Sequence, residues 1–256
     1  MAKSDVAYVA DKNDMRNPRN MIGPNLNFAA TEAYKLLRTN LMFSFSDEGK
    51  GRAIGITSSI QNEGKSLTAC NTAYALAESG KRVLLLEADL RKPTVAAKLG
   101  LARSLGLTNM LVSREELEVV VQQCDMAPNM DVVTSGDIPP NPSELLSSNR
   151  MLEVMEELKE KYDYIVVDLP PVTVVSDALA ISKALDGMVM VVRGGISERN
   201  VLSEAMRQLN MVNVPLLGFV YRGDDREIGS YRYKRKYKKY QKYYENYGYG
   251  YGYENK

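Results

Sequence analysis

Residues 57–66 read Thr-Ser-Ser-Ile-Gln-Asn-Glu-Gly-Lys-Ser, and this stretch decides the fold. It continues a short apolar run at 53–57 and precedes a helical pattern at 67–78 that ends at Gly80. A strand, a tight loop and a helix in this order turn backbone N–H groups and a helix N-terminus toward one point. The sequence therefore predicts a phosphate-binding loop here.

The last three residues of this stretch, Gly64-Lys65-Ser66, match the second half of the Walker A motif. In that motif the lysine reaches the β- and γ-phosphates and the hydroxyl holds Mg²⁺. Ser59 stands where the motif has its first glycine. Asn62 tolerates left-handed backbone angles better than most residues, so the loop can still form. We therefore expect nucleotide binding, against the alternative of a chance strand–turn–helix.

Apolar runs and helical patterns alternate along the rest of the chain. The apolar runs predict strands at 53–57, 83–86, 130–133, 164–167, 188–192 and 216–220. Helices are expected from about residue 31, at 67–78, at 143–161 with Ser143 as N-cap, from Asp177 and from Glu198. The strands are apolar on both faces, as in a parallel sheet covered by helices on both sides. The fold class is therefore α/β, with a doubly wound and mostly parallel sheet of the P-loop NTPase type.

Acidic residues follow two of the predicted strands. Glu87 and Asp89 follow the strand at 83–86, and Asp168 follows the strand at 164–167. Carboxylates at the carboxyl ends of adjacent parallel strands face the ligand crevice. We expect them to place Mg²⁺ or to activate a hydroxyl nucleophile, against the alternative of solvated strand ends.

The composition excludes several classes of site. The 256 residues contain no histidine, so a His-based triad and a His-ligated zinc are excluded. Two cysteines, Cys70 and Cys124, cannot form a disulfide framework or a four-Cys metal site. No apolar run approaches the roughly 20 residues of a membrane span, and residues 1–14 lack the apolar core of a signal peptide. These features predict a cytoplasmic location.

Residues 231–256 differ from the rest of the chain. They contain 10 of the 16 tyrosines, have a net charge of +6 and contain no aliphatic residue, whereas residues 1–230 have a net charge of −5. Such a segment cannot build a core, so we expect a disordered tail. A mobile tyrosine cluster suits a kinase substrate, and a basic aromatic tail also suits nucleic acid or anionic lipid. The tyrosines are Tyr231, Tyr233, Tyr237, Tyr240, Tyr243, Tyr244, Tyr247, Tyr249, Tyr251 and Tyr253.

Four segments together resemble a known family. They are 57–66, Glu-Ala-Asp-Leu-Arg-Lys-Pro at 87–93, Pro-Pro-Asn-Pro-Ser-Glu-Leu-Leu at 139–146 and Asp-Leu-Pro-Pro at 168–171. Over roughly residues 30–222 the chain resembles the cytoplasmic kinase domain of bacterial tyrosine kinases of the capsular and exopolysaccharide type. The expected organisation is an N-terminal arm at 1–30, a kinase domain at 31–230 and the tyrosine-rich tail at 231–256.

The resemblance implies an ATP- and Mg²⁺-dependent protein-tyrosine kinase that phosphorylates its own tail and regulates polysaccharide polymerisation and export. It implies catalytic roles for Lys65, Glu87, Asp89 and Asp168, and metal binding by Ser66, Glu87, Asp89 and Asp168. The nucleotide-binding set that it implies is Ser59, Ile60, Gln61, Asn62, Glu63, Gly64, Lys65, Ser66, Leu67 and Arg222.

Partners also follow from the resemblance. The Glu-x-x-Arg-x-x-Arg oligomerisation motif of the family maps to Glu32, Lys35 and Arg38, and implies a homo-oligomeric ring that phosphorylates in trans. A transmembrane activator, or polysaccharide co-polymerase modulator, is expected to hold the kinase at the inner face of the plasma membrane. A tyrosine phosphatase is expected as the opposing enzyme, and no nucleic acid is expected.

Three positions depart from the family pattern, and two other functions stay open. Glu87 replaces an aspartate, Lys35 replaces an arginine, and Arg222 stands near the position of an adenine-contacting asparagine. These departures keep open a non-catalytic, nucleotide-dependent scaffold. The other alternative is a MinD/ParA-like ATPase on membrane or DNA, but that group has a lysine where this chain has Ile60.

Overall fold

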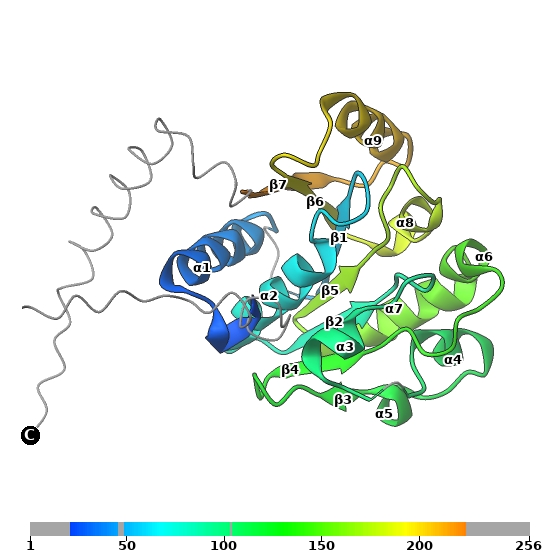
Figure 1. Cartoon of the computed structure of the whole chain (residues 1–256). Helices are drawn as coiled ribbons and strands as arrows, with labels where there is room; N and C mark the ends of the chain where they lie inside the picture. Colours follow the sequence, from blue (N-terminus) through cyan, green and yellow to red (C-terminus); the bar gives the residue numbers. More distant parts are fainter. Residues whose placement is uncertain (1–20, 46–48, 103, 224–256) are drawn as a thin grey trace, which may run out of the picture.

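The computed structural model describes residues 21–45, 49–102 and 104–223. In these ranges a seven-stranded sheet has the order β3-β4-β2-β5-β1-β6-β7 (Figure 1). β3 is antiparallel to β4, and every other neighbouring pair is parallel. The strands are β1 (Arg52–Ser58), β2 (Val83–Glu87), β3 (Gln122–Gln123), β4 (Met130–Val133), β5 (Tyr164–Asp168), β6 (Gly187–Arg193) and β7 (Leu216–Arg222).

Helices cover both faces of the sheet, as the two-sided apolar strands require (Figure 1). One face carries α1 (Phe28–Phe43), α2 (Lys65–Glu78) and α3 (Val95–Leu99). The remaining helices are α4 (Leu107–Val112), α5 (Leu117–Val120), α6 (Pro142–Leu146), α7 (Asn149–Lys161), α8 (Asp177–Ala180) and α9 (Arg199–Met211). Two short 3-10 helices, η3 (Gly23–Asn25) and η4 (Ser182–Ala184), complete the described elements.

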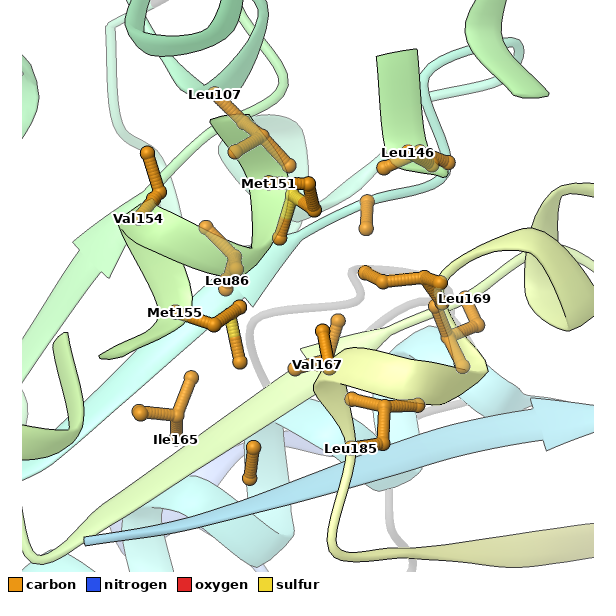
Figure 2. Packing of buried hydrophobic residues seen from close by; sticks show 14 of the residues in the cluster. Leu86, Leu107, Leu146, Met151, Val154, Met155, Ile165, Val167, Leu169 and Leu185 are labelled. Carbon is orange, nitrogen blue, oxygen red and sulfur yellow. The ribbon is translucent and has the colours of Figure 1, made fainter. Parts of the chain in front are cut away.

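Alternate residues of each central strand enter opposite cores. Leu84 and Leu86 of β2 pack into the core beneath α4 to α9, and Leu85 packs into the core beneath α1 and α2. Figure 2 shows Met151 and Met155 of α7 beside the sheet residues in the first of these cores. Burial of apolar area in these two layers is the main stabilising contribution to such a domain.

The order of the strands places the ligand crevice. The chain leaves β1 toward β2 on one side and leaves β5 toward β6 on the other. In open α/β sheets, ligands bind outside the carboxyl ends of the strands at such a reversal. The phosphate-binding loop follows β1 at this point. The predicted α/β class and the six predicted strands are confirmed.

The prediction of a single helix at 143–161 is wrong. It is divided into α6 and α7, because Ser148 is extended and its hydroxyl accepts a hydrogen bond from Met151 N, capping the second helix. Ser143 does not cap a helix: Asn141 is the N-cap residue of α6. The helix that begins at Asp177 is also short, and the antiparallel strand β3 had no signal in the sequence.

The boundary of the N-terminal arm also shifts. Ile22 is fully buried against α2, and Gly23 N donates to Asn71 Oδ1 at 2.9 Å. α1 begins at Phe28, and the side chain of its N-cap residue Asn27 accepts from Ala30 N at 2.9 Å. Residues 21–30 are therefore part of the folded body, and residues 1–20 lie outside the described residues.

Candidate active site

The phosphate-binding loop connects β1 to α2 with two left-handed residues. Asn62 has a φ of 66° and Gly64 has a φ of 94°. The tolerance of Asn62 for this conformation, predicted from its side chain, is confirmed. Gly64 is the N-cap residue of α2, and Lys65 and Ser66 begin the helix. The loop thus turns toward the positive end of a 14-residue helix.

Arg222, at the end of β7, lies directly over this loop. A Cβ atom on Gly64 would lie 2.7 Å from Arg222 Cζ and 3.0 Å from its Cδ. The backbone fixes this position, because Gly194 N donates to Arg222 O at 2.9 Å. The structure therefore brings Arg222 to the loop whose nucleotide it was predicted to bind, and the left-handed φ and the close guanidinium both demand glycine at 64.

Glu63 stabilises the phosphate-binding loop through hydrogen bonds. Its buried carboxylate accepts from Ser59 Oγ at 2.9 Å and from Ile60 N at 2.9 Å, and it also contacts Ser197 Oγ. Arg193 Nη1 donates to Asn62 O at 3.0 Å. The loop is therefore tied to the segment that follows β6. No sequence pattern indicates Ser197 or Arg193, because these contacts join residues more than 130 positions apart.

Lys65 points into a pair of carboxylates. Its Nζ lies 2.7 Å from Asp89 Oδ2 and 3.8 Å from Asp168 Oδ1. Burial by itself would lower the pKa of Lys65, but the charges of Asp168 and Asp89 outweigh it and the pKa is raised. Lys65 is therefore a fixed cation at the start of α2, as phosphate binding requires.

Asp168 is a buried carboxylate without hydrogen-bond donors. Its side chain is 1% exposed, and neither oxygen accepts a hydrogen bond within the described part of the chain. Burial raises the pKa of Asp168, and the charge of Lys65 opposes this shift. A buried, unsatisfied carboxylate is costly unless a ligand completes it.

These residues fit a magnesium ion that arrives with a nucleotide. Asp168 supplies an oxygen with no competing donor, and the largely buried Ser66 is in the first turn of α2, where the motif expects its hydroxyl. Within the described residues, no cluster of three or more Asp, Glu or Cys side chains forms a metal site by itself. This agrees with the preference of Mg²⁺ for one or two carboxylates together with phosphate oxygens and water.

Glu87 differs from the prediction that it faces the metal. Its carboxylate is fully buried and accepts hydrogen bonds from Thr94 N at 2.5 Å, from Val95 N at 2.6 Å and from Ser135 N at 3.1 Å. Burial raises the pKa of Glu87, and these three N–H groups oppose the shift. In this structure Glu87 joins the ends of β2 and β4 to the start of α3, so these hydrogen bonds give it a structural role.

Asp177 is a second buried carboxylate with a full set of partners, and it was missed. It accepts from Arg91 Nε at 2.8 Å and from Arg91 Nη2 at 3.0 Å, and Ser143 Oγ also donates to it. These contacts join two of the segments that carry the family resemblance, 87–93 and 139–146, to α8. Asp177 is not part of any of the four segments that carry the resemblance, so its role becomes visible only when the folded structure brings Arg91 and Ser143 to it.

A cavity of about 470 Å³ opens between these elements, within the range of small-molecule sites. It brings together predicted residues of the loop (Gln61, Asn62, Gly64, Lys65, Ser66 and Leu67) and Asp89. The opposite side is lined by residues that were not predicted, namely Arg91, Lys92, Thr94, Lys98, Pro170, Pro171, Val174 and Val175.

The predicted oligomerisation residues lie on α1, away from this cavity. Lys35 Nζ pairs with Glu32 at 2.9 Å. Arg38 turns onto α2, where Nη1 donates to Ala75 O at 3.0 Å and lies 3.6 Å from Glu78. The role of the three residues in assembly stays a prediction. The ten tail tyrosines lie outside the described residues. In the described ranges, no helix combines the length and apolar character needed to cross a bilayer.

Comparison with known proteins places the fold and the site in a family. Residues 52–209 match the AAA domain family. The chain is 40% identical over 193 residues to the tyrosine-protein kinase YwqD of Bacillus subtilis, covering 75% of this chain and 81% of that protein. It is 32% identical over 201 residues to the tyrosine-protein kinase CpsD of Streptococcus agalactiae, covering 78% and 86%.

Solved structures also have folds similar to that of this chain. The kinase domain of the Escherichia coli tyrosine kinase ETK superposes with a TM-score of 0.72 at 32% identity, covering 76% of this chain and 75% of that one. The chimerical protein CapA2B2 gives a TM-score of 0.70 at 31% identity, covering 78% and 84%. MinD of Pyrococcus horikoshii shares the fold, with a TM-score of 0.57 at 24% identity over 67% of this chain and 70% of that one. The chain spans only 27% of the length of full E. coli etk.

Proposed function

Because the chain belongs to the family of bacterial tyrosine-protein kinases, we propose that it transfers the γ-phosphoryl group of ATP to tyrosine side chains, its own tail included. The observation that supports this most is the position of Lys65. Its ammonium group lies between Asp89 and Asp168 at the N-terminus of α2, at 2.7 and 3.8 Å. This combines a phosphate-binding cation with Asp89, which lines the cavity, and with the buried Asp168.

The loop would hold the nucleotide as follows. N–H groups of residues 61–66 and the α2 terminus would bind phosphate oxygens, and Lys65 would exchange part of its pairing with Asp89 for the β- and γ-phosphates. Arg222 would lie against the nucleotide on the other side of Gly64. Ser66 and Asp168 would hold Mg²⁺, which neutralises charge on the phosphates when bound.

In the transfer, the bond between the γ-phosphorus and its bridging oxygen breaks and a bond from that phosphorus to the tyrosine oxygen forms. The phenol proton passes to a carboxylate of the cavity, and ADP leaves. Asp89 is the best-placed acceptor, because it lies at the cavity wall and is released when Lys65 turns to phosphate. Catalysis of this kind depends on positioning and charge more than on covalent chemistry.

The biological setting is proposed from the same relationship. The kinase would regulate capsular or exopolysaccharide polymerisation and export at the inner face of the plasma membrane. A transmembrane modulator would recruit and activate it, assembly through Glu32, Lys35 and Arg38 would allow phosphorylation in trans, and a tyrosine phosphatase would reverse the reaction. Each added phosphate brings about −1.5 to −2 charges, so several would reverse the sign of a tail of net charge +6.

A nucleotide-dependent scaffold is the second candidate, since Glu87 is taken up by backbone N–H groups. In that case ATP would bind and no phosphotyrosine would form. A MinD-like ATPase would instead hydrolyse ATP when liposomes or DNA are added.

Incubation of the full chain with Mg-ATP, with and without native membranes as a source of the modulator, separates these functions. We expect phosphotyrosine in residues 231–253 by mass spectrometry in the wild type and none in Lys65→Met. Lys183→Met is the matched control, because Lys183 is exposed and lies outside the cavity. Absence of tail phosphotyrosine under both conditions would contradict the proposal.

A further inference from the structure

The cavity beside the phosphate-binding loop has two unlike walls. One is apolar and consists of Pro170, Pro171, Val174 and Val175, which follow β5. The other carries basic side chains of the β2–α3 segment, including Lys92 and Lys98. The phosphates of ATP need the part of the cavity beside Lys65, and Arg222, which lies against Gly64 and outside the cavity lining, would hold the rest of the nucleotide away from the apolar wall. This wall is therefore available to a second reactant.

The apolar wall includes a side chain that is exposed to solvent. Val174 is 47% exposed although it borders the cavity, and it packs in neither apolar core. Pro170 is held rigidly, because Thr57 Oγ1 donates to its carbonyl oxygen at 2.7 Å. Pro170 and Pro171 are largely buried behind Val174, so the apolar surface open to an aromatic ring is centred on Val174, and burial of a tyrosine ring there removes apolar area from water.

The basic wall has charge left to neutralise. Arg91 on the same segment already pairs with Asp177, with its Nε 2.8 Å from Asp177 Oδ2. Among the described residues, neither Lys92 nor Lys98 has a carboxylate oxygen within 4.0 Å of its ammonium group. Lys92 Nζ instead donates to the neutral Gln61 Oε1 at 3.5 Å. Gln61 is at the outer tip of the loop, so Lys92 stands at the rim of the cavity rather than at its floor. The exposed Lys92 at the rim therefore attracts an anion, and the half-buried Lys98, whose charge also acts on Asp168, adds to this field.

We propose that this cavity is the acceptor subsite and that it selects tyrosines with an anionic neighbour. The tyrosine ring lies against Pro170, Pro171 and Val174, and a carboxylate or phosphate on the adjacent residue pairs with Lys92 and Lys98. The occupant is the tail of this chain, from the same or a second copy. The inference rests on the proposed kinase function and adds a substrate preference to it.

The tail has two sites that satisfy this rule. Its only acidic residues, Glu245 and Glu254, each follow a tyrosine directly, at Tyr244 and Tyr253. Tyr237 has a lysine on both sides instead. Phosphorylation should therefore begin at Tyr244 and Tyr253. A phosphate on Tyr244 then supplies an adjacent anion to Tyr243, so Tyr243 should follow these two sites.

Time-resolved mass spectrometry of the full chain tests the order. We expect Tyr244 and Tyr253 to be modified several times faster than Tyr237, and this order to vanish in Lys92→Gln/Lys98→Gln. The charge-reversed Lys92→Glu/Lys98→Glu should favour Tyr237, and Lys183→Glu is the control for a change of charge outside the cavity. An unchanged order in the two double variants overturns the acceptor subsite, whereas loss of all phosphotyrosine in the wild type overturns the kinase function.

Peptide binding tests the same subsite without catalysis. A labelled peptide of residues 241–248 is compared with its Glu245→Gln counterpart in fluorescence anisotropy with the full chain. The Glu peptide should bind more tightly, by roughly two- to fivefold per lysine as for partly exposed ion pairs, and high salt should remove the difference. Equal affinities, or a difference that persists in Lys92→Gln/Lys98→Gln, would contradict the assignment.

Discussion

Glu87 and Asp168 are neighbours at the carboxyl ends of two adjacent strands, but their carboxylates differ in hydrogen bonding. They end adjacent parallel strands and face each other in register. Glu87 is fully buried and Asp168 is 1% exposed. Three backbone N–H groups bind the Glu87 carboxylate, whereas neither oxygen of Asp168 accepts a hydrogen bond from the described residues.

This difference in hydrogen bonding is the one we expect between a structural acid and a ligand-binding acid. A buried carboxylate must be compensated, and Glu87 is compensated within the chain by the start of α3 and the end of β4. Asp168 has Lys65 at 3.8 Å and the Ser66 hydroxyl nearby, the same two groups that we propose to share a metal and a phosphate with it. Hydrogen-bond satisfaction, more than burial or position on a strand, distinguishes the two roles.

The largest expected effect is that of Asp168→Asn on activity. The variant removes the charge with little change in shape, so we expect phosphotyrosine formation to fall by about 100- to 1,000-fold, as when one electrostatic group of an active site is lost. The free energy of unfolding should stay the same or rise, because a buried uncompensated charge is removed. Kinase assays together with urea unfolding measure both quantities.

The pH dependence of stability supplies an internal control for this variant. Burial raises the pKa of Asp168 in the folded state above its unfolded value. The contribution of such a group to stability is present below the unfolded pKa and is lost as pH rises through the folded pKa. The stability advantage of Asp168→Asn should therefore grow as pH rises through the mildly acidic range. A constant advantage at all pH values would count against a shifted Asp168.

Glu87→Gln should show the opposite balance. It replaces one acceptor oxygen by an NH₂ group that faces a backbone N–H, so we expect the free energy of unfolding to fall by about 2–4 kcal/mol, because buried donors lose their partner. Activity measured well below the unfolding temperature should be reduced much less than in Asp168→Asn. Wild-type stability with complete loss of activity would instead make Glu87 a catalytic acid.

Asp177→Asn extends the comparison to a third acid. Asp177 is fully buried like Glu87 and is saturated by Arg91 and Ser143. We expect a loss of about 1–3 kcal/mol in unfolding free energy, since Arg91 is partly exposed and can be resolvated. Chemical denaturation measures this effect, and unchanged stability would show that the Arg91 contacts contribute little.

The sequence predicted the part of the site that depends on local order. The phosphate-binding loop, the positions of Asp89 and Asp168 at strand ends and all six longer strands follow from short patterns that the structure contains. It could not predict the orientation of Glu87, because its partners at 94, 95 and 135 come from backbone N–H groups that leave no side-chain signature. Asp177 and Ser197 were missed for the same reason: their contacts exist only once distant segments have folded together.

The smallest expected effect on stability is that of a substitution at the amino-terminal end of β5, the end opposite to Asp168. Tyr162, just before β5, donates from its hydroxyl to Asp131 Oδ2 at 2.7 Å. Tyr162→Phe should cost about 0.5–1.5 kcal/mol of stability and leave kinase activity unchanged. Burial and Asp131 raise the pKa of Tyr162, so its contribution is present below the ordinary tyrosine pKa and is lost as pH rises through the raised folded value. Alkaline unfolding curves of the wild type and the variant should therefore converge.

Asp168→Asn and Glu87→Gln, compared side by side for tail phosphotyrosine and for unfolding midpoint, test the division of roles most directly. We predict that Asp168→Asn is at least as stable as the wild type and inactive, and that Glu87→Gln is destabilised and still forms phosphotyrosine. An active Asp168→Asn, together with a Glu87→Gln that is inactive at wild-type stability, would contradict it.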